Sequence, residues 1–403
     1  NHGQNEPRAP VPFMPWTTLA LIGLLILFLG YVFLILQHGF DLSADVAPSL
    51  AAQLIQEKIP LTYAPYFNLP FIYQLGLPVL VAQLDWIPIP IHAWEWIFGV
   101  IGIGLLMFFI SFYFSTLMQN ALAGLIAVSA VFAMRLPFLN LLVGEYPLLF
   151  ALGMGFAGIC ILRHSPKWGA IVMGAVAIIH PYVAVNIGVI WLVLERPNWK
   201  KRIETALIGL AAFIPVLVIQ LIPFITSPKN VSTETGGLAL RTLLAFPFLA
   251  GILLCIFGFI LFIVILSQKQ GFSSPFKRAG MLIAIGFIGF VIGNYFPHLS
   301  VASKLVEITS IGLAGFISMG LISVCKKKNE LIAAALILIL VGTSTFVFSS
   351  SFQKFTIGSK ASIREAQFAQ WWGEQNPELA PTFFLAKGAE KMAFYSHKIP
   401  LTI

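Results

Sequence analysis

Residues 97–117 read IFGVIGIGLLMFFISFYFSTL, a stretch without one charged side chain. An α-helix rises about 1.5 Å per residue, so about 20 apolar residues are enough to cross the hydrocarbon core of a bilayer. Only a helix or a closed barrel satisfies its backbone groups in that environment. The stretch therefore predicts a transmembrane helix, and the rest of the chain repeats the pattern.

The same criterion predicts about eleven membrane spans. The apolar stretch around position 180 is divided in two at His180-Pro181, because proline disfavours continuation of a helix. The predicted spans are 17–36, 97–117, 121–139, 146–163, 168–180, 181–195, 203–224, 243–267, 279–296, 303–324 and 330–349.

Composition excludes the soluble classes of protein. Hydrophobic residues make up 58% of the 403 residues and charged residues only 10%, against about 25% charged in a typical soluble domain. Mean hydropathy is +0.90. Nucleic-acid binding, soluble enzymology and disorder are therefore excluded, and the three cysteines form no metal-type spacing. The fold class predicted is an all-α polytopic membrane protein.

Basic residues set the predicted orientation, since short cytoplasmic loops carry an excess of Lys and Arg. With the N-terminus in the cytoplasm, thirteen Lys and Arg fall in inside segments, and five fall in outside segments before the C-terminal tail. The sequence thus predicts an integral protein of a prokaryotic plasma membrane, in contact with membrane lipids. Its N-terminus is predicted to be cytoplasmic and its C-terminus extracytoplasmic.

Two outer regions stand apart from the spans. The transmembrane domain, 1–349, contains a long first outer loop, 37–96, with an amphipathic helix near its start and a short interfacial or re-entrant helix over 71–84. The C-terminal segment, 350–403, reads as a small α/β outer module. A helix through Trp371 and Trp372 and strand-like runs at 382–385 and 392–395 are predicted there, as the start of a larger soluble domain.

Ionisable groups at membrane depth are functional hypotheses by default, and the acids gather near the outer boundary. Asp41, Glu145 and Asp45 are the catalytic candidates. Each also has a structural alternative. Asp41 could be a helix N-cap, Asp45 could complement the dipole of the amphipathic helix, and Glu145 could be a solvated loop acid.

Basic residues on the same side are candidates for binding a lipid phosphate. The planar guanidinium of arginine suits this role, because it can make two parallel hydrogen bonds to phosphate oxygens. The structural alternatives are snorkelling for Arg135, a helix cap for Arg241 and a packed imidazole for His180. The full set of predicted phosphate-binding residues is Arg135, Arg241, His180, Lys229 and Lys304.

Several motifs resemble those of the GT-C superfamily of integral-membrane glycosyltransferases. The resemblance covers most of the chain in architecture. Its motifs are Gly39-Phe40-Asp41 followed by Asp45, Ala64-Pro65-Tyr66 through Gln74, Gly144-Glu145-Tyr146-Pro147, Ile179-His180-Pro181 and the tail segment Phe368–Pro381. Asp45 stands where that family often has His or Asn, and the family's Tyr-Pro-Pro is degraded.

The resemblance implies transfer of a sugar from a polyprenyl-phosphate-linked donor to an acceptor glycan, protein or lipid on the outer face. An outer-loop carboxylate would act as base, and basic residues would hold the leaving phosphate. No cofactor is required by the sequence; a divalent metal is compatible with it, and its ligands are unassigned. Two alternatives stay open: a non-catalytic accessory subunit in a complex of envelope proteins, and a transporter or flippase.

Overall fold

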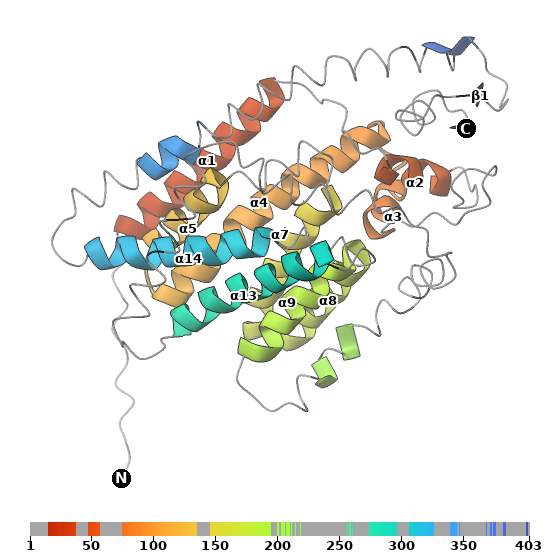
Figure 1. Ribbon diagram of the computed structural model, residues 1–403. Coiled ribbons are helices and arrows are strands. Elements are labelled where there is room, and N and C mark those ends of the chain that lie inside the picture. The colour runs from red at the N-terminus through yellow and green to blue at the C-terminus, as the bar shows by residue number, and fades with distance from the viewer. Residues whose placement is uncertain are drawn as a thin grey trace.

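The computed structural model is a bundle of helices (Figure 1). It describes residues 15–37, 47–56, 75–134, 146–194, 274–295, 306–325, 339–344, 382–383 and 400–401, with scattered positions between 200 and 218, 256 and 260, and 346 and 375.

Helices coincide with eight of the predicted spans. The other three, 203–224, 243–267 and 330–349, lie largely outside the described residues, so the number of spans stays a prediction. The eight helices are α1 (Pro15–Gln37), α4 (Ile91–Met118), α5 (Ala121–Ala133), α7 (Tyr146–His164), α8 (Pro166–Ile179), α9 (Pro181–Leu194), α13 (Ser274–Tyr295) and α14 (Val306–Cys325).

Local chemistry sets the sharp turn between α4 and α5. Gln119 follows α4 in the left-handed region, with φ 52°, and its backbone N–H donates to the carbonyl of Ser115. Asn120 then caps α5, because its side-chain oxygen accepts from the backbone N–H of Leu122 at 2.9 Å. Asparagine is among the residues preferred at an N-cap. The two helices consequently run antiparallel after a two-residue turn.

The α4–α7 pair makes the most extensive helix–helix contact among the described residues. A Cβ added at Gly102 would lie 2.7 Å from the backbone nitrogen of Phe150, and one added at Gly153 would lie 2.6 Å from the carbonyl oxygen of Gly102. Glycines at such a crossing let two helix backbones approach closely. Tyr113 and Phe156, farther along both helices, meet edge to face at 6.0 Å. The two helices therefore run parallel, with both N-termini at one end.

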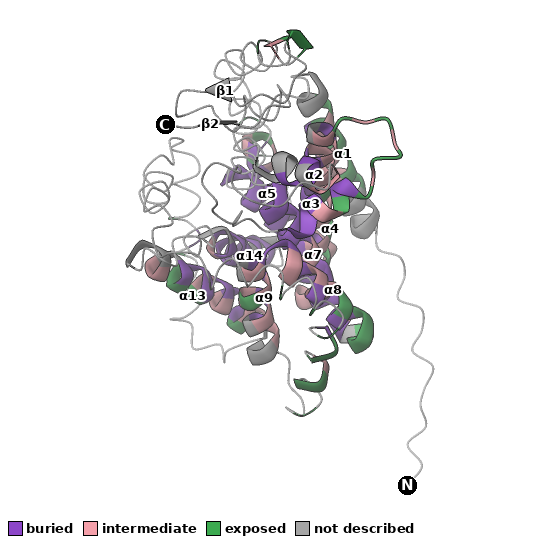
Figure 2. Ribbon diagram, turned by 90° about the vertical axis from the view of Figure 1, so that its right-hand side faces the viewer, coloured by how far each residue is buried: buried purple, intermediate pink, exposed green. Residues whose placement is uncertain are grey.

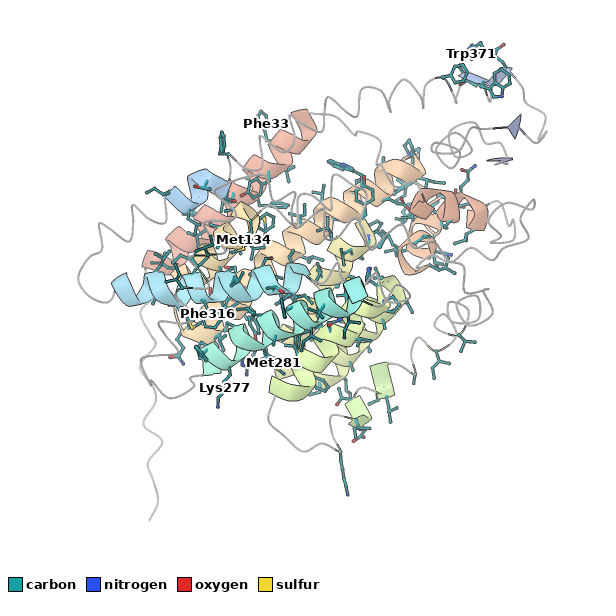
Figure 3. The ribbon with its side chains drawn as sticks, in the orientation of Figure 1. Phe33, Met134, Lys277, Met281, Phe316 and Trp371 are labelled. Atoms are coloured by element: carbon teal, nitrogen blue, oxygen red, sulfur yellow. The ribbon has the colours of Figure 1, made fainter. Side chains whose placement is uncertain are left out.

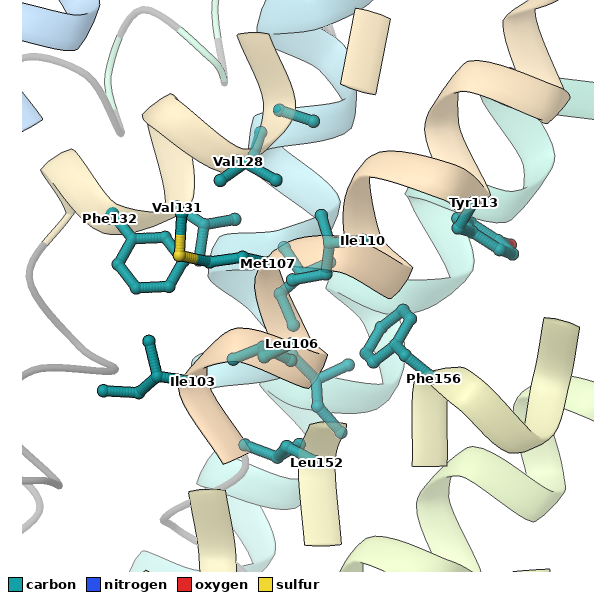
Figure 4. Packing of buried hydrophobic residues seen from close by; sticks show 14 of the residues in the cluster. Ile103, Leu106, Met107, Ile110, Tyr113, Val128, Val131, Phe132, Leu152 and Phe156 are labelled. Carbon is teal, nitrogen blue, oxygen red and sulfur yellow. The ribbon is translucent and has the colours of Figure 1, made fainter. Parts of the chain in front are cut away.

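Buried side chains from α4, α5 and α7 form the centre of the bundle (Figure 4). Ile103 and Met107 of α4 lie beside Val131 and Phe132 of α5 in this view. Phe132 also stacks on Tyr31 of α1, with ring centroids 5.6 Å apart. The core thus joins the first helix of the chain to the α4–α5–α7 layer.

Large apolar side chains are exposed on α1, α4 and α13, and Figure 2 colours the exposed positions of the helices green. Ile26 is 64% exposed and Phe287 is 59% exposed, and Leu25, Phe108 and Ile288 are also exposed. A contiguous apolar exterior is rare on a soluble monomer. Among the described residues, one helix is long and apolar enough to cross a membrane, Ala93–Met118, and five shorter apolar helices accompany it.

The first loop contributes two short helices, α2 (Ala47–Gln56) and α3 (Gly76–Ala82). Helix α2 lies within the predicted amphipathic segment, and it packs on α3 and α4. Helix α3 lies inside the 71–84 stretch, and most of its side chains are buried against the bundle. Its described helix is thus short and covered by protein, and the interfacial or re-entrant placement of the stretch stays a prediction.

The tail shows helical residues at Trp371 and Trp372, as predicted. Two-residue strands β1 (Thr382–Phe383) and β2 (Pro400–Leu401) pair in parallel. Strand β1 falls in a predicted strand-like run, whereas β2 does not, and the predicted run at 392–395 lies outside the described residues. The α/β character of the whole segment stays a prediction.

The α4–α7 crossing predicts an unequal response to two glycine-to-alanine changes. Gly102→Ala should destabilise the protein by about 1–3 kcal/mol, the usual cost of overpacking. Gly188→Ala is the matched control, because a Cβ there meets nothing within 4 Å, and alanine in a helix is favoured by about 0.5–1 kcal/mol. Thermal unfolding in detergent measures both. Equal melting temperatures for the two variants would contradict the crossing.

Candidate functional site

One end of the bundle gathers the first turns of α4, α7 and α9 and the last turn of α8; we call it the His180 end. Helix α8 runs antiparallel to α7, since Gly169 packs on Leu162 and Gly158 packs on Met173. The last turn of α8 is therefore level with the first turns of α7, and α9 begins there directly after His180.

His180 forms the corner between α8 and α9. Its backbone is extended, with φ −154° and ψ 92°, and its N–H donates to the carbonyl of Val176 at 2.8 Å. Its Nδ1 accepts from the backbone N–H of Val183 at 3.4 Å, which caps α9 with Pro181 at the first helical position. The side chain is 2% exposed.

Helix α3 packs directly on this corner. A Cβ added at Gly76 would lie 2.6 Å from the carbonyl carbon and oxygen of Ile178, two residues before His180. Leu77 and Val81 of α3 are fully buried. Glycine is needed here because any side chain would strike the α8 backbone. The first loop is thereby held against the corner.

A buried carboxyl lies in the first turns of α4. Glu95 is 0% exposed, and α4 contacts both α2, which carries the buried Gln53, and α3. Beside it, the indole nitrogen of Trp94 is buried and has no hydrogen-bond partner in the described part of the chain. Charged and polar side chains are rarely fully buried unless they are paired. The His180 end thus contains polar groups within protein as well as the corner histidine.

Glu95 and Gln53 were not among the predicted site residues. The sequence does hold a signal for Glu95, since an acid between Trp94 and Trp96 at the start of an apolar run is placed for burial. Gln53 has no comparable signal, because a glutamine on an amphipathic helix is ordinarily solvated. Only packing of α2 onto α4 reveals it.

Of the predicted site residues, the structure describes His180 alone. Glu145 directly precedes Tyr146, the buried first residue of α7, and Arg135 directly follows Met134, the buried residue that ends α5. Both α5 and α7 have these termini toward the His180 end. Asp41, Asp45, Glu145, Arg135, Arg241, Lys229 and Lys304 all lie outside the described residues.

Basic residues mark the opposite end of the bundle. Lys167 is exposed at the start of α8, and Lys277 is exposed near the start of α13 (Figure 3). Helix α13 is antiparallel to α14, because Phe276 meets Phe316 while Ile283 lies against Gly312. Lys167 and Lys277, assigned on sequence to the same side of the membrane, thus share one end of the fold.

No group of three or more His, Cys, Asp or Glu side chains is placed to hold a metal ion among the residues that the structure describes. Metal ligands therefore stay unassigned.

Two solved structures have a similar fold. ArnT from Cupriavidus metallidurans bound to undecaprenyl phosphate matches with a TM-score of 0.58 and 12% identity, over 96% of this chain and 85% of that chain. The apo state of the same ArnT matches with a TM-score of 0.60 and 13% identity over the same shares. No protein-family model and no curated protein matches the sequence. ArnT is a GT-C family glycosyltransferase, so the predicted resemblance is confirmed at the level of fold.

The geometry of the corner predicts that two substitutions of His180 differ in their effect on the free energy of unfolding. His180→Ala removes the α9 cap and should lower the free energy of unfolding by about 1 kcal/mol, whereas His180→Asn keeps an acceptor in place and should retain most of it. Thermal unfolding in detergent distinguishes them. An asparagine variant as unstable as the alanine variant would show that the ring stabilises the corner by packing and not as a cap.

Proposed function

We propose that this chain is a membrane glycosyltransferase, which transfers a sugar from a polyprenyl-phosphate-linked donor to an acceptor on the outer face of the membrane. One observation carries the proposal: 96% of the chain shares the fold of ArnT, which has been solved with undecaprenyl phosphate bound. A lipid-linked donor also gives a physical reason for a helical bundle with an apolar exterior, since the donor reaches a site only from within the bilayer.

The proposed reaction is a single displacement. The acceptor hydroxyl oxygen attacks the anomeric carbon, the bond from that carbon to the phosphate oxygen breaks, and the polyprenyl phosphate leaves with the electron pair. Asp41 takes the hydroxyl proton as general base. Asp45 and Glu145 are the other carboxylates proposed for the site. The acceptor is a glycan, a protein or a lipid.

The leaving phosphate carries negative charge that fixed cations stabilise. We assign this role to Arg135 and Arg241, whose guanidinium groups can bind phosphate oxygens in pairs, with Lys229 and Lys304 as further cations. His180 is also proposed for the site, at the corner where its Nδ1 accepts from the backbone N–H of Val183.

The His180 end is proposed to face outward, with the N-terminus in the cytoplasm, the C-terminus outside and the protein in the bacterial inner membrane. The supporting observation is that Lys167 and Lys277 share the opposite end, as the positive-inside rule requires of a cytoplasmic face. A divalent metal is not assigned a step. The accessory-subunit alternative predicts that the parental protein transfers no sugar in the experiment below. The transporter alternative is not favoured by the fold.

Asp41→Asn tests the proposed base. The variant should transfer sugar about 10²–10⁴-fold more slowly, because the general base is lost, while thermal stability stays nearly unchanged, since Asn and Asp are equivalent as N-caps. Transfer of radiolabel from undecaprenyl-phosphate-linked sugars into acceptors of bacterial membranes is the measurement. Asp85→Asn is the control, an exposed acid in the loop just before α4, and should transfer at the parental rate.

An Asp41→Asn variant with parental transfer would make Asp41 a cap, and the base would then be Asp45 or Glu145. A parental protein that transfers none of the labelled sugars would favour the accessory-subunit alternative.

A further inference from the structure

The loop between α3 and α4 carries an exposed apolar surface. Residues 83–90 read QLDWIPIP, and Trp86 at their centre is 76% exposed. The loop is ordered by its own backbone, since the N–H of Ile87 donates to the carbonyl of Leu84 at 3.0 Å. The N–H of Ile89 donates to the carbonyl of Ile87 at 2.7 Å. An exposed tryptophan is therefore presented on a folded turn.

We propose that residues 83–90 insert into the headgroup region of the bilayer at the His180 end, with Trp86 as the interfacial anchor. Tryptophan has an apolar ring and one N–H donor, and it is enriched where hydrocarbon meets headgroups. The loop has no Lys or Arg, and Asp85 is its one charged residue. Its surface fits a lipid interface better than it fits water.

The position of the loop supports the same partner. The chain passes from Pro90 directly into α4, which is long and apolar enough to cross a membrane. This helix exposes Ile101, Phe108 and Phe112. Figure 2 draws the loop as a trace that projects from the bundle beside α3. The apolar loop is thus continuous in sequence with an apolar helix exterior.

A second exposed tryptophan gives the other boundary. Trp168 is 66% exposed in the first turn of α8, beside the exposed Lys167. It lies at the end of the bundle opposite His180, where Lys277 also lies. Tryptophans at both membrane–water interfaces form the aromatic belts of membrane proteins. Trp86 and Trp168 therefore bracket the apolar exterior between two interfaces.

The proposed anchor would also set the depth of the His180 corner in the bilayer. Gly76 allows α3 to pack against Ile178. Trp86, the proposed anchor, follows α3 by a few residues in the sequence. The corner is then held at headgroup depth, where lipid phosphates lie. The inference rests on packing and exposure of described residues and does not require the proposed transferase activity.

Tryptophan quenching by brominated lipid tests the anchor. The protein is reconstituted in vesicles of phosphatidylcholine brominated at carbons near the headgroup, and emission is compared with that in unbrominated vesicles. Trp86→Phe should lose a lipid-quenchable component that belongs to one of the nine tryptophans. Trp94→Phe is the control, since Trp94 packs on Phe98 with its indole nitrogen buried; it should leave lipid quenching unchanged.

If Trp86→Phe leaves lipid quenching unchanged, the proposal is overturned. If Trp86→Phe instead loses quenching by iodide added to the aqueous phase, Trp86 faces water. If the variant loses neither lipid quenching nor iodide quenching, another protein surface covers the loop.

Discussion

At one crossing in the bundle, the backbones of α4 and α7 meet with no side chain between them. Gly102 and Gly153 supply the space, and any larger residue would strike main-chain atoms. Because the helices are parallel and touch here, their N-termini are held at the same end of the bundle. That places the buried Glu95 at the same end of the bundle as Tyr146, the residue that follows Glu145. The site proposed for catalysis depends on this register, although the two glycines lie well inside the bundle.

At the His180 end the chain changes direction between α8 and α9. Helix termini leave backbone groups unpaired, and a bilayer offers little water to satisfy them. His180 donates its own N–H back into α8 and uses its ring nitrogen to cap α9. Gly76 then lets α3 cover the corner. His180, a predicted phosphate-binding residue, therefore also stabilises the corner, and its role toward a substrate stays a prediction.

The spans could be predicted because the bilayer imposes a length and an apolar composition, and eight of them coincide with helices. The predicted and observed helix bounds differ where a polar residue is buried. Helix α4 begins at Ile91 and not at position 97. Glu95 is buried within the helix, whereas in sequence an acid marks the end of a span. The burial of Gln53 and the close packing of Gly76 on Ile178 follow from contacts between segments remote in sequence. No periodicity encodes such contacts.

Binding of the lipid phosphate at the His180 end is the central claim, and thermal stabilisation by undecaprenyl phosphate tests it most directly. The parental protein should be stabilised by this lipid and not by undecaprenol, which lacks the phosphate. Arg135→Gln should weaken the stabilisation, since the proposed cation is lost, while Lys277→Gln, at the opposite end, should leave it intact. Equal stabilisation by undecaprenol, or loss of stabilisation in the Lys277 variant alone, would contradict the account.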